Sequence, residues 1–259
     1  DCVMLHFDEI VFGPIFSRRL GSSLGVNLLP SKGKLCNFDC VYCECGWNKD
    51  GKADNKLPTK EEVFEAMEAK MEALSQEGTE VNTITFSGNG EPTLHPNFPE
   101  IIDFTLRMRD KYFPSAVVSV LSNATQIVKE EVRNALMKVD NPILKLDGAT
   151  DTFVEKIDRP NKGYTVAQII ENLKHFNGNF ILQTMFLRGE VDGETIDCTN
   201  PEEVSKWVEM AISLNPREVM MYTLDRETPA QNLSKVTAAE MEEIAKPLIE
   251  RGIKVQIRG

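Results

Sequence analysis

The chain has 259 residues, of which 40 are acidic and 29 are basic, so its formal net charge is −11. This length suits one sizeable α/β domain covering residues 1–259, and the acidic balance disfavours binding to nucleic-acid backbones. No apolar run has the length of a membrane span and no signal peptide is expected. The six cysteines are mostly clustered, which favours a reducing cytoplasm over a disulfide framework.

Strands and helices are predicted to alternate along most of the chain. After an N-terminal extension, residues 1–23, a first strand over Leu24–Leu29 leads into a cysteine-rich loop over residues 31–57. A helix follows over 59–76, because Thr59 and Glu62 have the spacing of a capping box and apolar residues recur at helical spacing. Further strands are expected over 83–87, 116–121, 142–146, 180–187, 218–224 and 254–257, and further helices over 97–112, 126–138, 164–176, 201–214 and 237–251.

This alternation predicts a parallel sheet in an α/β fold. Strands separated by helices of this length form βαβ units, whose sheet is buried on both faces. The chain contains about six to seven such units, fewer than the eight that close a TIM barrel. A flavodoxin-like doubly wound sheet would have the same pattern. In either architecture, the functional side chains lie at the carboxyl ends of the strands.

The most informative motif is the cysteine triplet Cys36, Cys40 and Cys43, with the spacing Cx3Cx2C. Three thiolates at this spacing can hold three irons of a [4Fe–4S] cluster and leave the fourth iron open to a small molecule, whereas clusters that only carry electrons commonly have four cysteine ligands. Three alternatives remain: a zinc site, a cluster closed by Cys45 as fourth ligand, and a disulfide with a spare thiol. The isolated Cys2 and Cys198 are expected to be structural.

Polar residues follow the ends of several predicted strands. The turn Gly88-Asn89-Gly90-Glu91 lets the backbone approach a ligand closely, and Glu91 could accept hydrogen bonds from an ammonium group. Ser122 and Asn123 either contact a ligand or cap the next helix. Lys145 and Asp147 point to one side of their strand, as an active-site pair or as a structural ion pair. The later candidates for ligand or substrate contact are Gln183, Tyr222 and Arg226.

The Cx3Cx2C motif with Tyr42 before its third cysteine resembles the radical SAM superfamily. The segment 12–27, Asn89–Thr93, Ile157–Pro160 and Gln183–Phe186 resemble the wyosine-synthase-like branch of that superfamily. The resemblance implies an open, partial (β/α)6 barrel, in agreement with the six to seven units counted above. It also implies a [4Fe–4S] cluster on Cys36, Cys40 and Cys43, with S-adenosylmethionine (SAM) bound at the open iron.

The resemblance also implies residues that seat SAM. The Gly-Asn-Gly-Glu turn would hold the amino group of its methionine moiety, Ser122 and Asn123 its ribose, and Arg159 its carboxylate. The full set of predicted SAM contacts is Tyr42, Gly88, Asn89, Gly90, Glu91, Ser122, Asn123, Asp147, Arg159 and Gln183.

These residues predict a radical SAM enzyme of oxidoreductase or lyase type that works in the cytoplasm. An electron from a flavodoxin- or ferredoxin-type donor would cleave SAM to a 5′-deoxyadenosyl radical, which would abstract hydrogen from a small-molecule or protein substrate. The acidic charge makes tRNA a less favoured substrate, and Lys145, Gln183 and Tyr222 are the candidate catalytic residues. The alternatives are an activase that forms a glycyl radical on a partner enzyme and a non-enzymatic iron–sulfur or zinc module.

Overall fold

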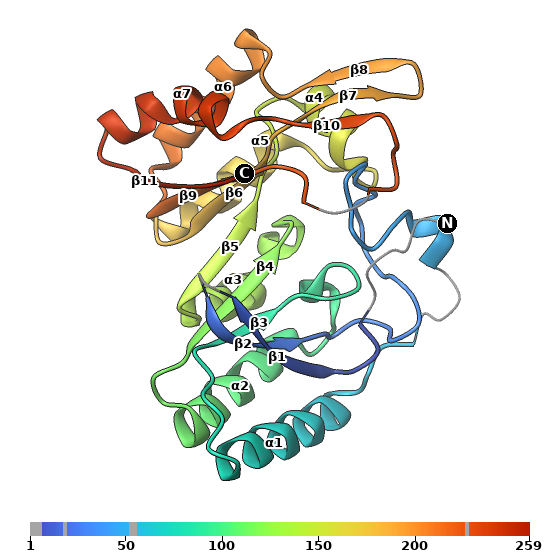
Figure 1. Ribbon diagram of the computed structural model, residues 1–259, viewed down its shortest axis with the longest axis vertical. Helices are drawn as coiled ribbons and strands as arrows, with labels where there is room; N and C mark the ends of the chain where they lie inside the picture. Colours follow the sequence, from blue (N-terminus) through green and yellow to red (C-terminus); the bar gives the residue numbers. More distant parts are fainter. Residues whose placement is uncertain (1–6, 18–19, 52–55, 226–227) are drawn as a thin grey trace.

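The computed structural model describes residues 7–17, 20–51, 56–225 and 228–259. Its main element is an eight-stranded sheet with the order β1-β2-β3-β4-β5-β6-β9-β11 (Figure 1). Neighbouring strands pair in parallel from β2 to β11, and only β1 pairs antiparallel, with β2. The strands are β1 Val11–Ser17, β2 Gly21–Val26, β3 Thr83–Phe86, β4 Val117–Ser122, β5 Asn141–Lys145, β6 Ile181–Met185, β9 Glu218–Tyr222 and β11 Lys254–Arg258.

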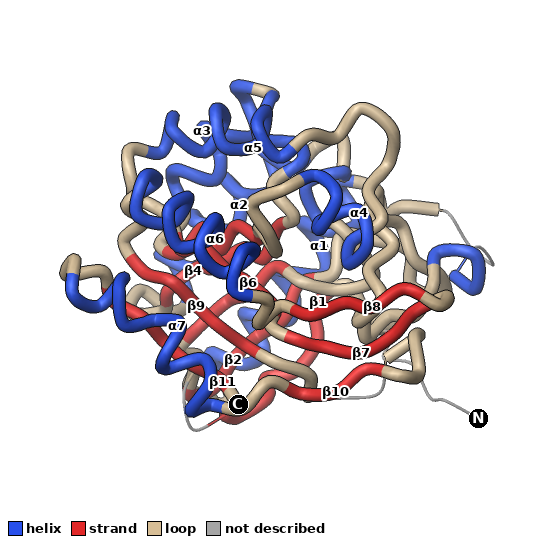
Figure 2. Tube along the Cα trace, turned by 90° about the horizontal axis from the view of Figure 1, so that it is seen from above, coloured by secondary structure: helices blue, strands red, loops and turns tan. Residues whose placement is uncertain are grey.

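The helices that connect the strands pack on one another in chain order, with α1 on α2, α2 on α3 and α6 on α7 (Figure 2). The side chain of Thr59 accepts a hydrogen bond from the Glu62 backbone N–H at the start of α1, and the predicted apolar stripe of this helix is buried. The helices are α1 Lys60–Gln76, α2 Phe98–Tyr112, α3 Glu130–Lys138, α4 Asp151–Asp158, α5 Val166–Leu173, α6 Pro201–Leu214 and α7 Ala238–Glu250.

Two apolar clusters lie on opposite faces of the sheet. Leu144, Leu182 and Val219 belong to the large core, which also contains the buried residues of the helices. The alternate positions Ile143, Ile181 and Met220 form a second, small cluster, with Leu121 packed against it. Because side chains alternate along a strand, Lys145, Gln183 and Tyr222 point to the same face as this small cluster. The small cluster is therefore the floor beneath these polar residues.

The expected architecture is confirmed: seven parallel strands form an open, partial barrel of the radical SAM type. The first strand differs from the prediction, since β2 covers Gly21–Val26 rather than Leu24–Leu29. An antiparallel strand, β1, was not predicted, because Gly13-Pro14 interrupts its sequence. Proline is tolerated at a sheet edge, and the β1–β2 register shifts between Phe12 and Ile15.

Two predicted elements are divided in the structure. The strand expected over 180–187 ends at Met185, and Leu187 begins β7 in a separate three-stranded sheet. This sheet has the order β10-β7-β8, with β7 Leu187–Val191, β8 Glu194–Asp197 and β10 Leu233–Lys235. The helix expected over 126–138 divides at Lys129, whose backbone is extended, into a short 3-10 helix, Thr125–Val128, and α3.

Cys2 and Arg226 lie outside the described residues. Within the described ranges, no helix is long and apolar enough to cross a membrane.

An ion pair links the small sheet to α7. Arg188 of β7 donates through Nη2 to Glu240 Oε1 at 2.6 Å, and through Nη1 to Glu240 Oε2 at 2.7 Å. The hydrogen bond from Arg188 is the main reason that the pKa of Glu240 falls from 4.5 to about 2. Because the pKa is lower in the folded chain, this pair stabilises the fold above pH 4.5, and the stabilisation is lost as the pH falls toward 2.

We expect Glu240→Gln to lower the urea midpoint of unfolding above pH 4.5, and to have a progressively smaller effect as the pH falls toward 2. Glutamine can still accept the hydrogen bond of the α7 capping box, so the substitution removes the charge while leaving the cap. A difference in midpoint that stays constant over this pH range would contradict the assignment.

Candidate active site

The cysteine loop follows β2 and is held on one side by the end of α4. The backbone N–H groups of Asp39 and Val41 donate to the carbonyl oxygens of Asp158 at 2.8 Å and Ile157 at 2.9 Å. The last carbonyls of a helix have no partner within it, so the loop completes the C-terminus of α4. Arg159 then ends the helix in the left-handed conformation, with φ of 44°. The stretch Ile157–Pro160 therefore forms the seat of the cysteine loop.

The opposite side of the loop is held by the glycine-rich turn after β3. The Leu35 N–H donates to the Asn89 carbonyl at 2.9 Å, and the Glu91 N–H donates to the Leu35 carbonyl at 3.0 Å. Gly90 lies between them with φ of 132°, and a Cβ there would lie 1.8 Å from the Leu35 oxygen. Only glycine suits this position. The buried Asn89 side chain donates to the carbonyls of Phe7 and Pro30, so it supports the turn from beneath.

The three cysteines of the motif line one cavity of about 180 Å³. Three soft sulfur donors from one loop are the donor set that iron–sulfur clusters require. Within the described ranges, no three His, Cys, Asp or Glu side chains are grouped to hold one metal ion. A cluster does not need such a group, since each cysteine would bind a different iron, and the zinc alternative gains no support. Lining residues of this smaller cavity include Lys34, Cys36, Cys40, Cys43, Cys45, Gly88, Gly90, Glu91, Ser122 and Asn123.

The thiols differ in acidity. Burial raises the pKa of Cys36 to about 11 and raises the pKa of Cys40 well above its usual value. A hydrogen bond from Cys45 is the main reason that the pKa of Cys43 falls to about 5, and the nearby Lys34 lowers it further. Thiolates are the metal-binding form, so loading of this site must release protons from Cys36 and Cys40.

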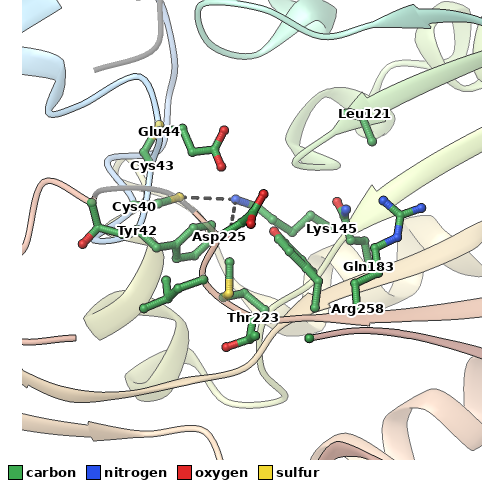
Figure 3. A pocket seen from close by; sticks show the side chains of 15 residues that line it. Cys40, Tyr42, Cys43, Glu44, Leu121, Lys145, Gln183, Thr223, Asp225 and Arg258 are labelled. Atoms are coloured by element: carbon green, nitrogen blue, oxygen red, sulfur yellow. Dashed lines mark hydrogen bonds between the residues drawn. The ribbon is translucent and has the colours of Figure 1, made fainter. Parts of the chain in front are cut away.

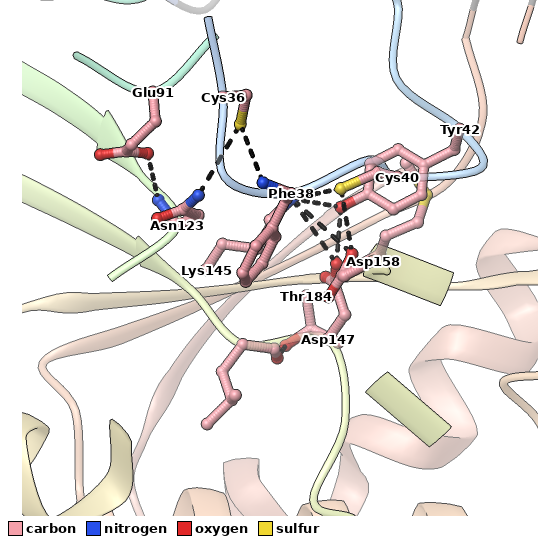
Figure 4. Close-up of polar contacts among 12 residues, drawn as sticks. Cys36, Phe38, Cys40, Tyr42, Glu91, Asn123, Lys145, Asp147, Asp158 and Thr184 are labelled. Carbon is pink, nitrogen blue, oxygen red and sulfur yellow. Dashed lines mark hydrogen bonds and ion pairs between the residues drawn. The ribbon is translucent and has the colours of Figure 1, made fainter. Parts of the chain in front are cut away.

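Glu91 organises the wall of the smaller cavity beside Cys36. Its buried carboxylate accepts hydrogen bonds from the Asn123 N–H at 2.7 Å, the Ser122 hydroxyl at 2.8 Å, and the N–H and hydroxyl of Thr93. Burial raises the pKa of this carboxyl in spite of these hydrogen bonds. The Asn123 side chain points to the cysteine loop, where its Nδ2 lies 3.8 Å from Cys36 Sγ (Figure 4). The same Nδ2 donates to Asn37 Oδ1 at 2.7 Å. The structure thus brings Glu91, Ser122 and Asn123 together beside Cys36, while their roles toward SAM stay predictions.

Lys145 joins the cysteine loop to two buried carboxylates (Figure 4). Its Nζ donates to Cys40 Sγ at 3.3 Å and to the Tyr42 hydroxyl at 2.9 Å, and lies 3.8 Å from an oxygen of both Asp147 and Asp158. Cys40 Sγ–H donates to Asp158 Oδ1 at 3.2 Å. Burial and the neighbouring carboxyl of Asp147 raise the pKa of Asp158. Burial alone would lower the pKa of Lys145, but Cys40 and the two carboxylates raise it overall.

Beside the smaller cavity is a larger one, of about 580 Å³ (Figure 3). Six residues line both cavities and form a shared wall: Cys40, Cys43, Leu121, Lys145, Gln183 and Tyr222. Lys145 and Gln183 are partners in the β5–β6 register. Tyr222 pairs with Met185, two residues nearer the carboxyl ends of the strands. The three candidate catalytic residues therefore lie together in the same wall as two of the thiols, Cys40 and Cys43. The remaining lining includes Glu44, Met185, Thr223, Leu224, Asp225, Thr228 and Arg258.

Arg159 lies apart from both cavities. Its guanidinium donates to Asp192 Oδ2 at 2.9 Å and lies 5.0 Å from the centre of the Trp47 ring. It therefore fastens the β7–β8 hairpin to the cysteine loop, and its predicted contact with the SAM carboxylate stays a prediction. Cys198 is buried outside the two cavities.

Sequence reasoning did not find three residues of the site. Asp158 lies in the stretch Ile157–Pro160, which resembles the family, but the sequence predicted a role in SAM binding only for its neighbour Arg159. Lys34 precedes the first cysteine by two positions, and its buried Nζ donates to the Gly46 carbonyl at 2.7 Å. Arg258 ends the last strand and reaches the larger cavity. Only Lys34 could have been found from the sequence, because it lies next to the cysteine triplet. Asp158 and Arg258 reach the site through contacts between distant parts of the chain.

The similarity to known proteins agrees with this geometry. Residues 31–201 match the model of the radical SAM superfamily. The chain is 30% identical to a UPF0026 protein of Methanocaldococcus jannaschii over 219 residues, covering 83% of this chain and 63% of that relative. It is 31% identical to a UPF0026 protein of a Synechocystis strain over 228 residues, covering 85% of this chain and 77% of the relative. The chain thus spans less than two thirds of the length of the M. jannaschii protein.

Solved structures share the fold at low identity. A radical SAM methyltransferase from Sphaerobacter thermophilus superposes with a TM-score of 0.68 at 16% identity, over 94% of this chain and 67% of that one. SuiB of Streptococcus suis, bound to SAM, superposes with a TM-score of 0.63 at 13% identity, over 88% of this chain and 49% of SuiB. Archaeal TYW1 superposes with a TM-score of 0.51 at 16% identity, over 88% of this chain and 71% of TYW1.

The family matches confirm the resemblance inferred from the cysteine motif, together with its two cofactors, a [4Fe–4S] cluster and SAM. The matched span contains the cysteine loop, the glycine-rich turn, Lys145 and Gln183. The chain belongs to the radical SAM superfamily and to the UPF0026 family.

Proposed function

We propose that this protein is a radical SAM enzyme whose substrate binds in the larger cavity. The observation that carries the proposal is the shared wall: Lys145, Gln183 and Tyr222 face both the cavity of the three cysteines and the larger cavity. Cys40 and Cys43 line both cavities too, so a reactive species formed at the thiols would lie beside a bound substrate. The cavity of about 580 Å³ is within the range of small-molecule sites, which favours a small substrate over a protein partner.

The cofactors would supply the difficult chemistry. When bound, they would use one electron from a flavodoxin- or ferredoxin-type donor to break a carbon–sulfur bond of SAM, giving methionine and a 5′-deoxyadenosyl radical that would take a hydrogen atom from the substrate and become 5′-deoxyadenosine. The chain would contribute three thiolates, the polar wall organised by Glu91, and the buried surroundings that exclude water. The proposal includes direct contacts between SAM and Ser122, Asn123, Asp147 and Gln183.

The test is formation of 5′-deoxyadenosine by the anaerobically reconstituted and reduced protein. We expect the product only when SAM and a reductant are both present, together with an equal amount of methionine. A preparation with about four irons per chain that binds SAM but yields no 5′-deoxyadenosine would overturn the proposal. If substrate is absent, slow uncoupled cleavage of SAM is the expected signal.

Lys34 provides a second readout that does not depend on turnover. Its ammonium group is buried in the wall that Cys36 and Cys43 also line, and a buried positive charge there favours the more negative, reduced state of a cluster. We expect Lys34→Met to lower the reduced-to-oxidised ratio at a fixed potential about tenfold, which is about 59 mV for one electron. A titration followed by electron paramagnetic resonance measures this ratio. Lys34→Arg, which keeps the charge, is the matched control, and equal potentials in all three proteins would contradict the expectation.

A further inference from the structure

Arg258 lies in the wall of the larger cavity and has no carboxylate partner among the residues that the structure describes. Its side chain is half-buried, its Nε is fully buried, and in the described part of the chain Nε has no hydrogen-bond partner. Its Nη2 donates a long hydrogen bond to Gln256 Oε1, at 3.4 Å. A guanidinium has five N–H donors, and leaving a buried donor without an acceptor costs free energy. Because Nε is buried, the donors that Arg258 can offer to the cavity are those of its two Nη atoms, and the one described acceptor for them is the long contact to Gln256.

Three other arginines of this chain have carboxylate partners, whereas Arg107, Arg133, Arg217 and Arg251 have none among the described ion pairs. Arg109, Arg159 and Arg188 each lie within 3.0 Å of a carboxylate oxygen. With 40 acidic residues against 29 basic ones, carboxylates are abundant, so a scarcity of partners does not explain the state of Arg258. Among the described ion pairs, none includes Arg258. We propose that Arg258 binds an anionic group, a carboxylate or a phosphate, of the substrate. This inference rests on the proposed function, because it assigns the occupant of the larger cavity.

The register of the sheet places this anion site relative to the shared wall. Arg258 pairs with Tyr222, and Tyr222 pairs with Met185, so the three lie at one level of neighbouring strands. Lys145 and Gln183 lie two residues deeper, at the level of Met220. Figure 3 shows the side chains of Arg258, Gln183 and Lys145 facing the cavity. A ligand anchored at Arg258 would extend its body toward the shared wall and its two thiols.

The rest of the cavity wall defines the body of the ligand. Leu121, Met185 and Leu224 are apolar parts of the lining. The carboxylates of Glu44 and Asp225 also line the cavity, and they would repel a second anionic group. The geometry therefore points to a ligand with one anionic group and an apolar body. Arginine matches either oxyanion, because its planar fork can donate two parallel hydrogen bonds to a carboxylate or a phosphate.

The test is equilibrium dialysis of labelled acetate, labelled butyrate and inorganic phosphate against the reconstituted, cluster-loaded chain. We expect saturable binding of one anion per chain. Each methylene that butyrate has beyond acetate should lower the dissociation constant about fourfold. Arg258→Gln should weaken binding at least about tenfold, and Arg258→Lys should restore part of it because the charge returns. Arg251→Gln is the matched control, because Arg251 is exposed at the end of α7 and should leave binding unchanged.

Each outcome has a definite meaning. Binding of phosphate but not butyrate, lost in Arg258→Gln, would support the site and identify phosphate as the anion. Equal binding by wild type and Arg258→Gln, with iron content and thermal unfolding of the variant unchanged, would overturn the inference, as would the absence of binding at millimolar concentrations. Formation of 5′-deoxyadenosine is measured on the same wild-type preparation. Cleavage of SAM without anion binding removes only this inference, and anion binding without cleavage removes only the proposed function.

Discussion

Replacement of Cys40 by alanine is expected to abolish 5′-deoxyadenosine formation and to prevent retention of a full cluster. The Cys40 sulfur is buried at the centre of the site, 3.3 Å from Lys145 Nζ and 3.2 Å from Asp158 Oδ1. Without this thiolate, a cubane would have two protein ligands instead of three. The remaining space would also be bordered by two carboxylates, which are hard ligands that iron–sulfur clusters rarely use. Iron and sulfide content and the assay for 5′-deoxyadenosine measure the loss.

Two other cysteine variants make this result specific. Cys198→Ala removes a buried thiol that lines neither cavity, and it should keep both the cluster and 5′-deoxyadenosine formation. Cys45→Ala tests the closed-cluster alternative, because Cys45 lines the smaller cavity beside Cys43. If Cys45→Ala rather than Cys40→Ala lost the cluster, the assignment of the three ligands would be wrong. If Cys45→Ala alone gained SAM cleavage, Cys45 would be the fourth ligand of a closed cluster.

The parallel sheet could be predicted because its signals are local. The run 83–87 and the helix over 59–76 can each be recognised within a short window of sequence, and both occur close to the expected bounds. The β10-β7-β8 sheet depends on long-range pairing instead. Leu233 of β10 pairs with Gly189 of β7, and β10 has only three residues, Leu233–Lys235. A strand this short has no visible alternation of apolar and polar residues, so no pattern predicted it.

The same distinction applies to the candidate site. Lys145, Gln183 and Tyr222 could be predicted to lie together, because parallel strands bring their carboxyl ends to one edge. Asp158 could not, since its contact with Cys40 depends on how α4 docks against the cysteine loop. Lys145 and Asp147 could be predicted either as a structural ion pair or as an active-site pair, and the structure is compatible with both. Lys145 pairs with Asp147 at 3.8 Å and at the same time lines both cavities.

The position of this buried charge cluster has a consequence for function. Tyr42 lies in the cysteine loop, Lys145 on β5 and Asp158 on α4, and hydrogen bonds or ion pairs join them across long stretches of chain. Buried polar networks become rigid when every member has a partner. The network therefore fixes the cysteine loop against the end of β5, which is the geometry that keeps the shared wall between the two cavities.

Replacement of Asp147 by alanine is expected to remove about 3–5 kcal/mol of folding free energy, because it takes away one of the two carboxylates beside the buried Lys145 and leaves two buried donors without their acceptor. The Asp147 side chain has no exposed surface. Its Oδ2 accepts from the Tyr42 hydroxyl at 2.6 Å, its Oδ1 accepts from the Met185 N–H at 3.0 Å, and Lys145 Nζ lies 3.8 Å away. Alanine offers none of these interactions, and the cavity it leaves adds to the cost. Urea unfolding of the metal-free chain at neutral pH measures the change.

An exposed aspartate provides the matched control for this prediction. Asp103 pairs with Lys138 at 3.0 Å, and its side chain is 47% exposed, so Asp103→Ala should cost at most about 1 kcal/mol. Asp147→Asn should lie between the two variants, because its amide oxygen can still accept from the Met185 N–H while the charge beside Lys145 is lost. If Asp147→Ala cost no more than Asp103→Ala, Asp147 would not hold the cysteine loop to β5, and the rigid shared wall would need another origin.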